Sequence, residues 1–501
     1  MSQVTVTKKN ESIVRVHAEP SILQEISDLF EFEVPGAKFS PKFKSGFWNG
    51  RIRIFSMLTG ELPLGLVSKV YAYCKESGYE FTGDYDIVRE DLTEDEWNEF
   101  IDHLTFCSKG EPIAAHSYQV DSVFTALTRG RAILLSPTGS GKSLMLYMMV
   151  RWHEIQERKQ LIIVPSVQLV EQMYNDFDDY ATEDTWDVSK SCVKIYGGKE
   201  KTFDKNVTIA TWQTLITMSK EFFEQFDVVY NDECHGAKAK SLTDIMNNCV
   251  NAGFRVGMTG TLDGTKVNKL VLEGLCGPVI NVTTTKKLMD ADTLADLTIQ
   301  GLVFQYPAEQ RKYVANHAKK YTEEVDFIVK HDHRNAYITD LALSRTGNTL
   351  VLFQFVEKHG KVLYDIIKEK LLHDSKGRKV FFVHGGVGGE EREDIRAIVG
   401  NETDAIIVAS FGTMSQGVNV PTLEHVIVAS STKSRIRILQ SIGRGLRRTE
   451  EKTTCTVYDL GDDLSWKSRQ NYSLLHFIER IKTYAEENFT YVVRPVELGL
   501  E

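Results

Sequence analysis

A short glycine-containing segment, 136–143 with the sequence SPTGSGKS, has the residue types and spacing of a phosphate-binding loop. It follows the apolar run 132–135 and precedes the stretch 144–153, whose apolar residues recur with helical periodicity. Glycines let backbone N–H groups approach phosphate oxygens, and the amino end of a helix adds partial positive charge. We expect Lys142 to neutralise the β- and γ-phosphates of ATP and Ser143 to hold Mg²⁺. The rest of the predicted cradle consists of Thr138, Gly139, Ser140 and Gly141.

Two adjacent acids, Asp232 and Glu233, follow the apolar run 226–230 in the sequence NDECH. A pair of acids at a strand end is by itself more often a solvated terminus. Downstream of a phosphate-binding loop, however, the pair supplies what ATP hydrolysis requires. Asp232 is expected to bind Mg²⁺ through water, and Glu233 to orient and deprotonate the attacking water molecule.

The elements that must position these residues form two α/β units. Short, fully apolar runs alternate with helical stretches, which indicates parallel strands covered by helices on both faces. The predicted strands are 132–136, 161–165, 207–210, 228–231 and 255–259, and then 349–353, 380–383, 405–409, 425–429 and 454–459. We therefore predict a small α+β domain (1–85), an acidic linker with one helix (86–111), a first doubly wound domain (112–280), a connecting segment (281–347) and a second doubly wound domain (348–501).

Composition places the chain among globular proteins of a reducing compartment. Of its 501 residues 42% are apolar and 26% charged, and no apolar run reaches the roughly 20 residues of a membrane span. The first residues lack the apolar core of a signal peptide. The 7 cysteines are scattered without a CxxC pair, which argues against structural disulfides and zinc. We predict a cytoplasmic location, which would be the host cytoplasm if the chain is encoded by a phage.

The net charge of −10 hides local clusters of basic residues. The segment 36–55 contains no acid and interleaves bases with aromatic residues, a pattern suited to phosphates and splayed bases. We hypothesise that it binds duplex DNA; the alternative is that Phe43, Phe47 and Trp48 form the core of a small domain. The predicted DNA contacts in this segment are Lys38, Lys42, Lys44, Arg51 and Arg53.

Over roughly residues 112–465, the order of the sequence motifs resembles that of the superfamily 2 helicases. Tyr118-Gln119 is similar to the adenine-reading glutamine motif, although His116 stands where that family often has arginine. Four further segments are similar to family motifs in the expected order: 164–172, 210–215, 259–261 and 417–421. Asn419 occupies a place where aspartate is usual. The segment 440–447, QSIGRGLR, matches the sixth motif.

The resemblance implies two RecA-like domains with ATP between them. Gln119 and Gly417 would contact the nucleotide, and Arg444 and Arg447 would act on the γ-phosphate as arginine fingers. Arg435 and Arg437 are as compatible with DNA binding as with a solvated connection. Phosphate contacts along the nucleic acid are implied for Ser166, Gln168, Thr211 and Gln213, with a helix N-cap as the alternative for the last two.

The whole chain most closely resembles the recombination and repair members of the superfamily. That implies an ATP-dependent DNA helicase that unwinds and branch-migrates Holliday junctions, stalled forks and R-loops in recombination, repair and replication, with RNA–DNA hybrids as further substrates. Two alternatives remain open from the residues: a duplex translocase or RNA helicase that remodels complexes without separating strands, and a nucleic-acid-binding scaffold with an inactive ATP site.

Overall fold

The protein is described from a computed structural model. The described residues are 2–34, 36–184, 186–197, 204–235, 240–262, 265–372, 377–385, 402–415, 423–432, 434, 438–439, 441–443, 446 and 452–499. By their internal contacts they divide into two compact units. Unit 1 holds Met1–Ser136 and Gly141–Thr283, and unit 2 holds Pro137–Ser140 and Thr284–Glu501.

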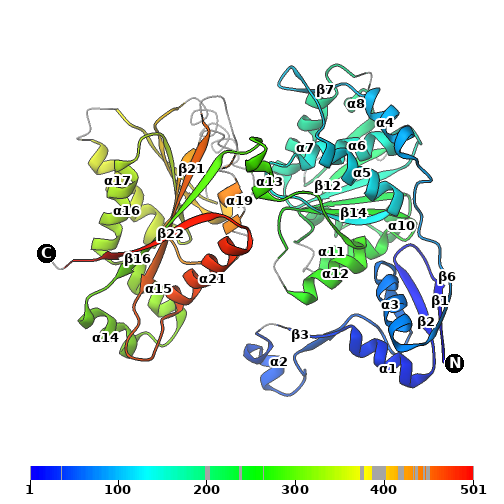
Figure 1. Ribbon diagram of the computed structural model, residues 1–501, viewed down its shortest axis with the longest axis horizontal. Helices are drawn as coiled ribbons and strands as arrows, with labels where there is room; N and C mark the ends of the chain where they lie inside the picture. The colour runs from blue at the N-terminus through cyan, green and yellow to red at the C-terminus, as the bar shows by residue number, and fades with distance from the viewer. Residues whose placement is uncertain are drawn as a thin grey trace. The chain divides into compact units, whose positions relative to one another are not determined.

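The amino-terminal part of unit 1 is a small α+β domain, drawn in blue in Figure 1. Its mixed sheet has the order β5-β2-β1-β6 and carries the helices α1 and α3 on one face. A two-stranded ribbon, β3-β4, extends from it. The elements are β1 (Gln3–Lys8), β2 (Ile13–His17), α1 (Pro20–Leu29), β3 (Glu31–Glu33), η1 (Ala37–Phe39), α2 (Pro41–Lys44), β4 (Arg51–Arg53), β5 (Glu61–Pro63), η2 (Leu64–Leu66), α3 (Val67–Ser77) and β6 (Glu80–Asp84).

A parallel seven-stranded sheet forms the remainder of unit 1, in the order β11-β12-β10-β13-β14-β9-β15. Its strands are β9 (Arg131–Leu135), β10 (Gln160–Val164), β11 (Cys192–Ile195), β12 (Val207–Thr211), β13 (Val228–Asp232), β14 (Phe254–Thr259) and β15 (Val279–Asn281). Its helices are α5 (Ser117–Arg129), α6 (Lys142–Glu154), α7 (Val167–Tyr180), α8 (Val188–Ser191), α9 (Trp212–Leu215), α10 (Lys220–Phe223), α11 (Lys240–Asn248) and α12 (Lys266–Cys276).

This sheet is buried on both faces because helices cover each of them (Figure 1). Successive side chains of a strand point to opposite faces. Leu134 accordingly lies in the apolar cluster formed with α5, α6 and α7, whereas its neighbour Ile133 lies in the cluster formed with α11 and α12. Strands buried on both sides read as continuous apolar runs. Five of the seven strands contain such runs and were predicted, whereas the short edge strands β11 and β15 were missed.

The acidic segment 86–111 leads into the same domain. Its helix α4 (Glu94–Asp102) begins with a capping box between Thr93 and Glu96, and its Trp97 is buried in the cluster with α5 and α6. A two-stranded ribbon follows, made of β7 (Phe106–Ser108) and β8 (Glu111–Ile113).

Unit 2 contains a second parallel seven-stranded sheet, in the order β18-β19-β17-β20-β21-β16-β22. Its strands are β16 (Asp296–Gln305), β17 (Asn348–Phe353), β18 (Val380–Val383), β19 (Ile406–Ser410), β20 (Leu423–Val428), β21 (Thr454–Asp463) and β22 (Thr490–Glu497). Its helices are α13 (Thr285–Asp290), α14 (Ala308–His317), α15 (Tyr321–Val329), α16 (Asp332–Ser344), η4 (Val356–Gly360), α17 (Lys361–Leu371), α19 (Phe411–Ser415) and α21 (Tyr472–Glu486). Both sheets agree with the predicted fold class of two doubly wound domains after a small α+β domain.

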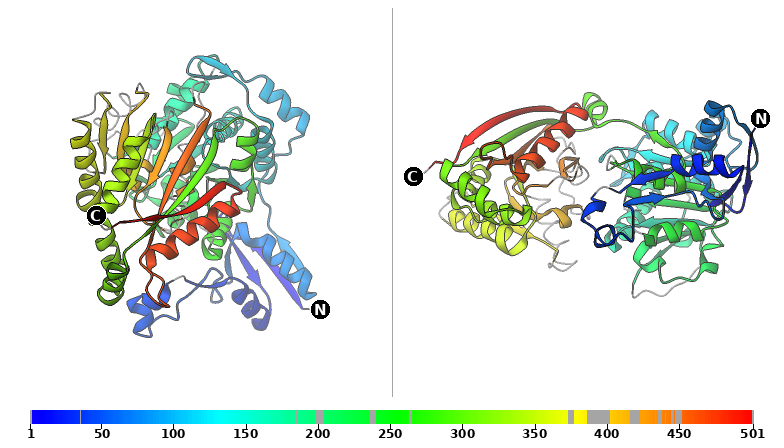
Figure 2. Two further views of the ribbon diagram at one scale, coloured as in Figure 1. Left: turned by 60° about the vertical axis from the view of Figure 1, so that its left-hand side comes forward. Right: turned by 90° about the horizontal axis from the view of Figure 1, so that it is seen from below.

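One segment differs from its expected place. We expected 281–347 to be a connecting segment between the two parallel domains. Instead β16 pairs with β21 and β22 inside the second sheet, and α16 packs in the core of unit 2. The helix α21 covers the opposite face of that sheet (Figure 2). On this face the ring of Phe477 lies over Gly301 and Gly461. β16 was missed because Thr298, Gln300 and Gly301 interrupt its apolar pattern.

Within unit 1 the small domain is joined to the parallel domain by buried polar contacts. Glu11 pairs with the buried guanidinium of Arg131 at 3.3 Å, and the hydroxyl of Ser12 accepts a hydrogen bond from Arg255 at 2.8 Å. Gly65 lies against the backbone of α12, so closely that a Cβ atom there would be 2.1 Å from the carbonyl oxygen of Glu273. In the described part of the chain no helix is long and apolar enough to cross a membrane.

Candidate functional site

Three neighbouring strands of the first parallel sheet end at the same edge, and each carries one of the predicted motifs there. β13, β14 and β9 are adjacent and parallel. Asp232 ends β13, Thr259 ends β14, and Ser136 follows β9, with the backbone N–H of Ser136 donating to Thr259 at 3.0 Å. The carboxyl edge of an open parallel sheet is where such folds bind ligands. Segments separated by more than a hundred residues thus meet at one place.

The phosphate-binding segment has the backbone that the glycines were expected to permit. Gly139 and Gly141 have φ of +85° and +76°, a left-handed conformation that side chains with a Cβ rarely adopt. α6 begins at Lys142, whose ammonium donates to the carbonyl of Ser136 at 3.1 Å. A Cβ atom on Gly141 would lie 2.2 Å from the side-chain amide nitrogen of Gln119. The loop therefore requires glycine at this position for both its conformation and its packing.

Gln119, the predicted adenine-reading residue, lies beside this loop. It stands in the first turn of α5 and is only 3% exposed. Its side-chain carbonyl accepts a hydrogen bond from the backbone N–H of His116 at 2.8 Å, which holds the amide nitrogen toward Gly141. Hence the structure brings the glutamine motif and the phosphate-binding motif together, as the sequence order implied.

The two acids differ in their surroundings. Burial, followed by the negative charge of Glu233, raises the pKa of Asp232 to about 7, while the ammonium of Lys142 acts in the opposite direction. Glu233 has a left-handed backbone with φ of +51°, and its carboxylate lies 3.1 Å from Nδ1 of His235. Strained conformations of this kind in non-glycine residues are concentrated at functional sites.

The donor set fits a magnesium ion. Mg²⁺ prefers hard oxygen ligands and commonly takes only one or two carboxylates from the protein. Asp232 and Glu233 provide carboxylates, and a nearby cation would lower the raised pKa of Asp232. Ser143, in the first turn of α6, provides a hydroxyl oxygen. The side chains of Asp232 and Ser143, which are expected to hold the metal, are therefore of a chemical type that suits Mg²⁺.

A hydrogen bond links the acid pair to the motif at 259–261. Nδ1 of His235 lies 3.0 Å from the hydroxyl of Thr259, and that hydroxyl also contacts the backbone of Thr261. A displacement of the acid pair would consequently alter the hydrogen bonds of the segment after β14. Both motifs are recognisable in the sequence, whereas the contact between them is not.

The predicted phosphate-contact residues have mixed surroundings. Ser166 caps α7, with its hydroxyl accepting from the N–H of Leu169 at 3.3 Å, and Gln168 follows in the first turn. Gln213 is exposed, and its amide donates to the carbonyl of Pro165 at 3.0 Å, which joins two of the motifs. Thr211 is 3% exposed, and its hydroxyl pairs with that of Thr214 at 3.0 Å. Thr211 occupies the N-cap position of α9, but its side chain makes no capping hydrogen bond.

The basic residues of the amino-terminal domain lie on its surface. All five predicted contacts are exposed, and Phe47 beside them is 90% exposed. Arg51 and Arg53 both pair with Glu31, at 3.2 and 3.1 Å, so part of their charge is compensated. Trp48 is half-buried and donates its indole N–H to the carbonyl of Arg51 at 2.7 Å. The alternative that these aromatic residues form a core does not hold for Phe47, whose ring is exposed.

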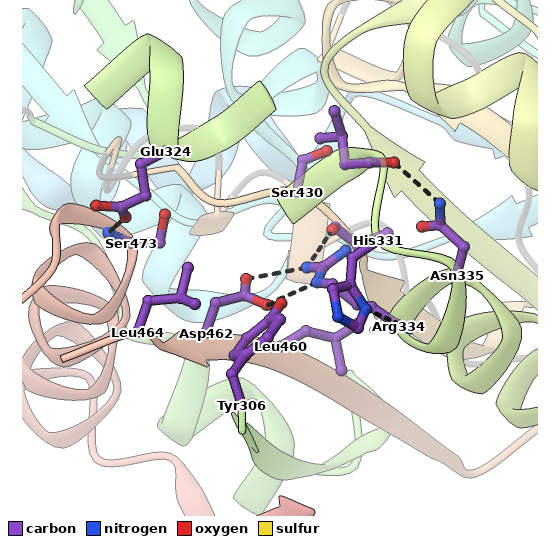
Figure 3. Close-up of polar contacts among 12 residues, drawn as sticks. Tyr306, Glu324, His331, Arg334, Asn335, Ser430, Leu460, Asp462, Leu464 and Ser473 are labelled. Carbon is purple, nitrogen blue, oxygen red and sulfur yellow. Dashed lines mark hydrogen bonds and ion pairs between the residues drawn. The ribbon is translucent and has the colours of Figure 1, made fainter. Parts of the chain in front are cut away.

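In unit 2 a buried polar network surrounds the chain just after β20, the strand that leads toward the sixth motif. The guanidinium of Arg334 bonds the carboxylate of Asp462 at 2.6 Å and the carbonyl of Ala429 at 2.9 Å (Figure 3). The hydroxyl of Ser430 forms a hydrogen bond with Nδ1 of His359 at 3.1 Å, and the guanidinium of Arg480 donates to the carbonyl of Thr432 at 2.9 Å. Three helices therefore hold the backbone of 429–432 in place. Gly417, Asn419, Arg435, Arg437, Arg444 and Arg447 lie outside the described residues.

Comparisons with known proteins cover nearly the whole chain. Three family models match: "DNA helicase UvsW, N-terminal" over residues 3–84, "Type III restriction enzyme, res subunit" over 109–264, and "Helicase conserved C-terminal domain" over 333–449. The ATP-dependent DNA helicase uvsW of Enterobacteria phage T4 is 37% identical, over 97% of this chain and 98% of its own length. The DNA 3'-5' translocase XPB2 of Sulfurisphaera tokodaii is 24% identical, over 70% of this chain and 83% of its own.

Solved structures agree. The crystal structure of T4 UvsW covers 99% of this chain and 100% of its own, with 35% identity and a TM-score of 0.53. A fragment of a putative HsdR subunit of a type I restriction enzyme from Vibrio vulnificus covers 89% of this chain and 85% of its own, with 17% identity and a TM-score of 0.58. The second likeness concerns the fold alone.

Proposed function

Because this chain belongs to the UvsW family of ATP-dependent DNA helicases, we propose that it unwinds and branch-migrates branched DNA, including four-way junctions, stalled forks and RNA–DNA hybrids in displaced loops. It is an ATP-hydrolysing helicase that binds nucleic acid. One observation above all supports the assignment of its site. The phosphate-binding segment, the acid pair and the motif at 259–261 converge at the ends of three adjacent parallel strands.

In the proposed cycle Lys142 binds the β- and γ-phosphates, and the backbone of residues 138–141 surrounds them. Mg²⁺, held by Ser143 and by Asp232 through water, would neutralise charge that develops on the phosphates. Glu233 orients the attacking water and takes its proton, which is the task of a general base. Gln119 contacts the adenine ring. Arg444 and Arg447 stabilise the transferring phosphoryl group, a contribution of about 10³–10⁵ in rate for an arginine finger.

The amino-terminal domain is the proposed binding site for branched DNA. Its exposed bases suit backbone phosphates, and the exposed ring of Phe47 suits a splayed base at a branch point. Because this domain is joined to the parallel domain through buried Glu11–Arg131 and Ser12–Arg255 contacts, a force generated in the parallel domain would reach the bound DNA. Ser166, Gln168 and Gln213 are proposed as contacts to the tracked strand.

The deciding experiment measures ATP hydrolysis and strand separation on several substrates in parallel. These are a four-way DNA junction, a forked DNA, a displaced loop with an RNA–DNA hybrid, a forked RNA and a plain DNA duplex. The proposal expects DNA-stimulated hydrolysis and preferential unwinding of the branched DNA. Hydrolysis without strand separation would favour a translocase, and a preference for forked RNA would favour an RNA helicase. Absence of hydrolysis would favour a scaffold with an inactive ATP site.

Lys142→Ala should abolish hydrolysis while sparing DNA binding, because the phosphate cradle and the basic surface are separate. Lys220→Ala is the matched control. Lys220 is an exposed lysine of the same parallel domain that begins the short helix α10, away from the three strand ends. Loss of activity in both variants would argue against a specific role for Lys142.

A further inference from the structure

Two hydroxyl groups from different helices meet beside the phosphate-binding segment. The hydroxyl oxygens of Ser143 and Tyr180 lie 2.9 Å apart, although the residues are 37 positions apart in the chain. Ser143 stands in the first turn of α6, and Tyr180 is the last residue of α7. Neither the motif containing Ser143 nor any motif found in the sequence includes Tyr180.

The ring of Tyr180 is held in place by its neighbours. It packs edge-on against Tyr147 at 5.5 Å, and Tyr147 lies one helical turn beyond Ser143 on the same side of α6. The hydroxyl of Tyr147 accepts from Arg151 at 3.0 Å, and Arg151 forms a buried ion pair with Asp184, just after α7. The ends of the two helices are therefore locked together, and the Tyr180 hydroxyl has a defined position.

The other end of α7 begins at a proposed nucleic-acid contact. Ser166 caps the helix, and the amide of Gln213 is bonded to the neighbouring carbonyl of Pro165. Fourteen helical residues, about 21 Å of rigid helix, separate Ser166 from Tyr180. A displacement of the first turn by a bound strand would thus be carried to the hydroxyl that contacts Ser143.

A neutral serine that ligates a cation must aim an oxygen lone pair at it, so its proton has to be donated elsewhere. Groups that accept or donate such second hydrogen bonds orient metal ligands and tune metal affinity. We propose that Tyr180 is a positioning residue. Its hydroxyl accepts a hydrogen bond from the hydroxyl of Ser143 when the metal is bound, and through α7 it makes the metal site responsive to the bound strand. This inference rests on the proposed role of Ser143 as a ligand of Mg²⁺.

The test removes one oxygen atom with Tyr180→Phe, which retains the ring packed against Tyr147. Binding of a fluorescent ADP analogue is titrated with Mg²⁺ and, separately, in excess chelator. We expect the apparent Mg²⁺ affinity of the nucleotide complex to fall about 10-fold, as is typical when a partner of a metal ligand is lost, with metal-free nucleotide binding unchanged. The stimulation of ATP hydrolysis by DNA should decrease relative to the basal rate. Tyr174→Phe, a matched change on the same helix, should alter neither quantity.

A double-mutant cycle with Ser143→Ala separates this role from a general loss of stability. If Tyr180 acts through Ser143, adding Tyr180→Phe to Ser143→Ala should change the Mg²⁺ dependence no further. Equal Mg²⁺ affinity in Tyr180→Phe and the unmodified protein, or fully additive effects in the cycle, would overturn the inference. If the unmodified protein binds and hydrolyses nucleotide without Mg²⁺, the proposed metal role of Ser143 fails instead.

Discussion

Arg334 and Asp462 form a fully buried ion pair between α16 and the end of β21. The guanidinium Nε lies 2.6 Å from one carboxylate oxygen, and the other oxygen is 3.1 Å from Nη2. The hydroxyl of Tyr306 also donates to Asp462, at 2.8 Å. Neither charged side chain is more than 1% exposed. Figure 3 shows the contact between the two side chains. The pair therefore stabilises unit 2 only while both partners are present, because either charge alone would be buried without compensation.

Removal of one partner should be strongly destabilising. Arg334→Met leaves the carboxylate of Asp462 buried, and we expect the unfolding free energy of the second parallel domain to fall by about 3–5 kcal/mol. The double variant Arg334→Met with Asp462→Asn should recover part of that loss, since no uncompensated charge remains. Chemical denaturation followed by a fluorescent probe in unit 2 measures both. A double variant that is less stable than the single one would contradict this explanation.

The packing of Gly141 against Gln119 predicts a severe effect of one methyl group. Gly141→Ala places a Cβ where the Gln119 amide stands and forces a side chain into a left-handed conformation. We expect nucleotide binding to be lost while DNA binding remains, as measured by titration with the fluorescent ADP analogue. Gly197→Ala is the control, because among the described residues nothing lies within 4 Å of the added methyl group there. Normal nucleotide binding by Gly141→Ala would show that the loop tolerates this change.

Charge reversal tests the proposed DNA surface of the amino-terminal domain. The triple variant Lys42→Glu, Lys44→Glu, Arg51→Glu should bind junction DNA weakly. Its logarithmic salt dependence should be shallower by about 3, since each lost phosphate contact removes about 0.9 from the slope. Lys75→Glu, at an exposed position of α3 in the same domain, is the control. Affinity and salt slope equal to those of the unmodified protein would remove this surface from the proposal.

Phe47 offers a separate test of base stacking. Because its ring is 90% exposed, Phe47→Ala should leave the melting temperature unchanged. If the ring stacks on a splayed base, junction binding should weaken by about 1–3 kcal/mol, whereas binding to plain duplex should not. Fluorescence anisotropy with the two DNAs makes the comparison. An equal loss on both DNAs would indicate a non-specific surface effect.

His359 predicts a pH dependence of stability in unit 2. Burial, with a smaller contribution from the charge of Arg334, lowers the pKa of His359 to about 3 from its usual 6.5. Between these values the unfolded chain binds a proton that the folded protein does not. Acidification below pH 6.5 should therefore cost at most about 1.4 kcal/mol per pH unit through this residue. His359→Gln should flatten the decline in melting temperature between pH 6.5 and 5; an unchanged slope would assign the decline to other groups.

The sequence by itself determined which chemistry the chain carries and the class of its fold. Phosphate-binding loops and acid pairs are local patterns, and strands buried on both faces are apolar throughout. Asp232 and Glu233 could therefore be placed at the end of a strand, and Lys142 at the start of a helix, without coordinates. The family assignment followed from motif order. The edge strands β11 and β15 were missed because they are short, and β16 was missed because glycine and polar residues interrupt its apolar pattern.

Only the tertiary structure decided which side chains meet. The Ser143–Tyr180 contact and the Arg334–Asp462 pair join residues 37 and 128 positions apart, and no local pattern specifies such partners. Burial likewise separated Thr211, whose hydroxyl is used internally, from Phe47, whose ring is exposed although an aromatic residue usually favours a core. Hydrogen bonding and burial depend on how elements pack, and packing is a property of the folded chain as a whole.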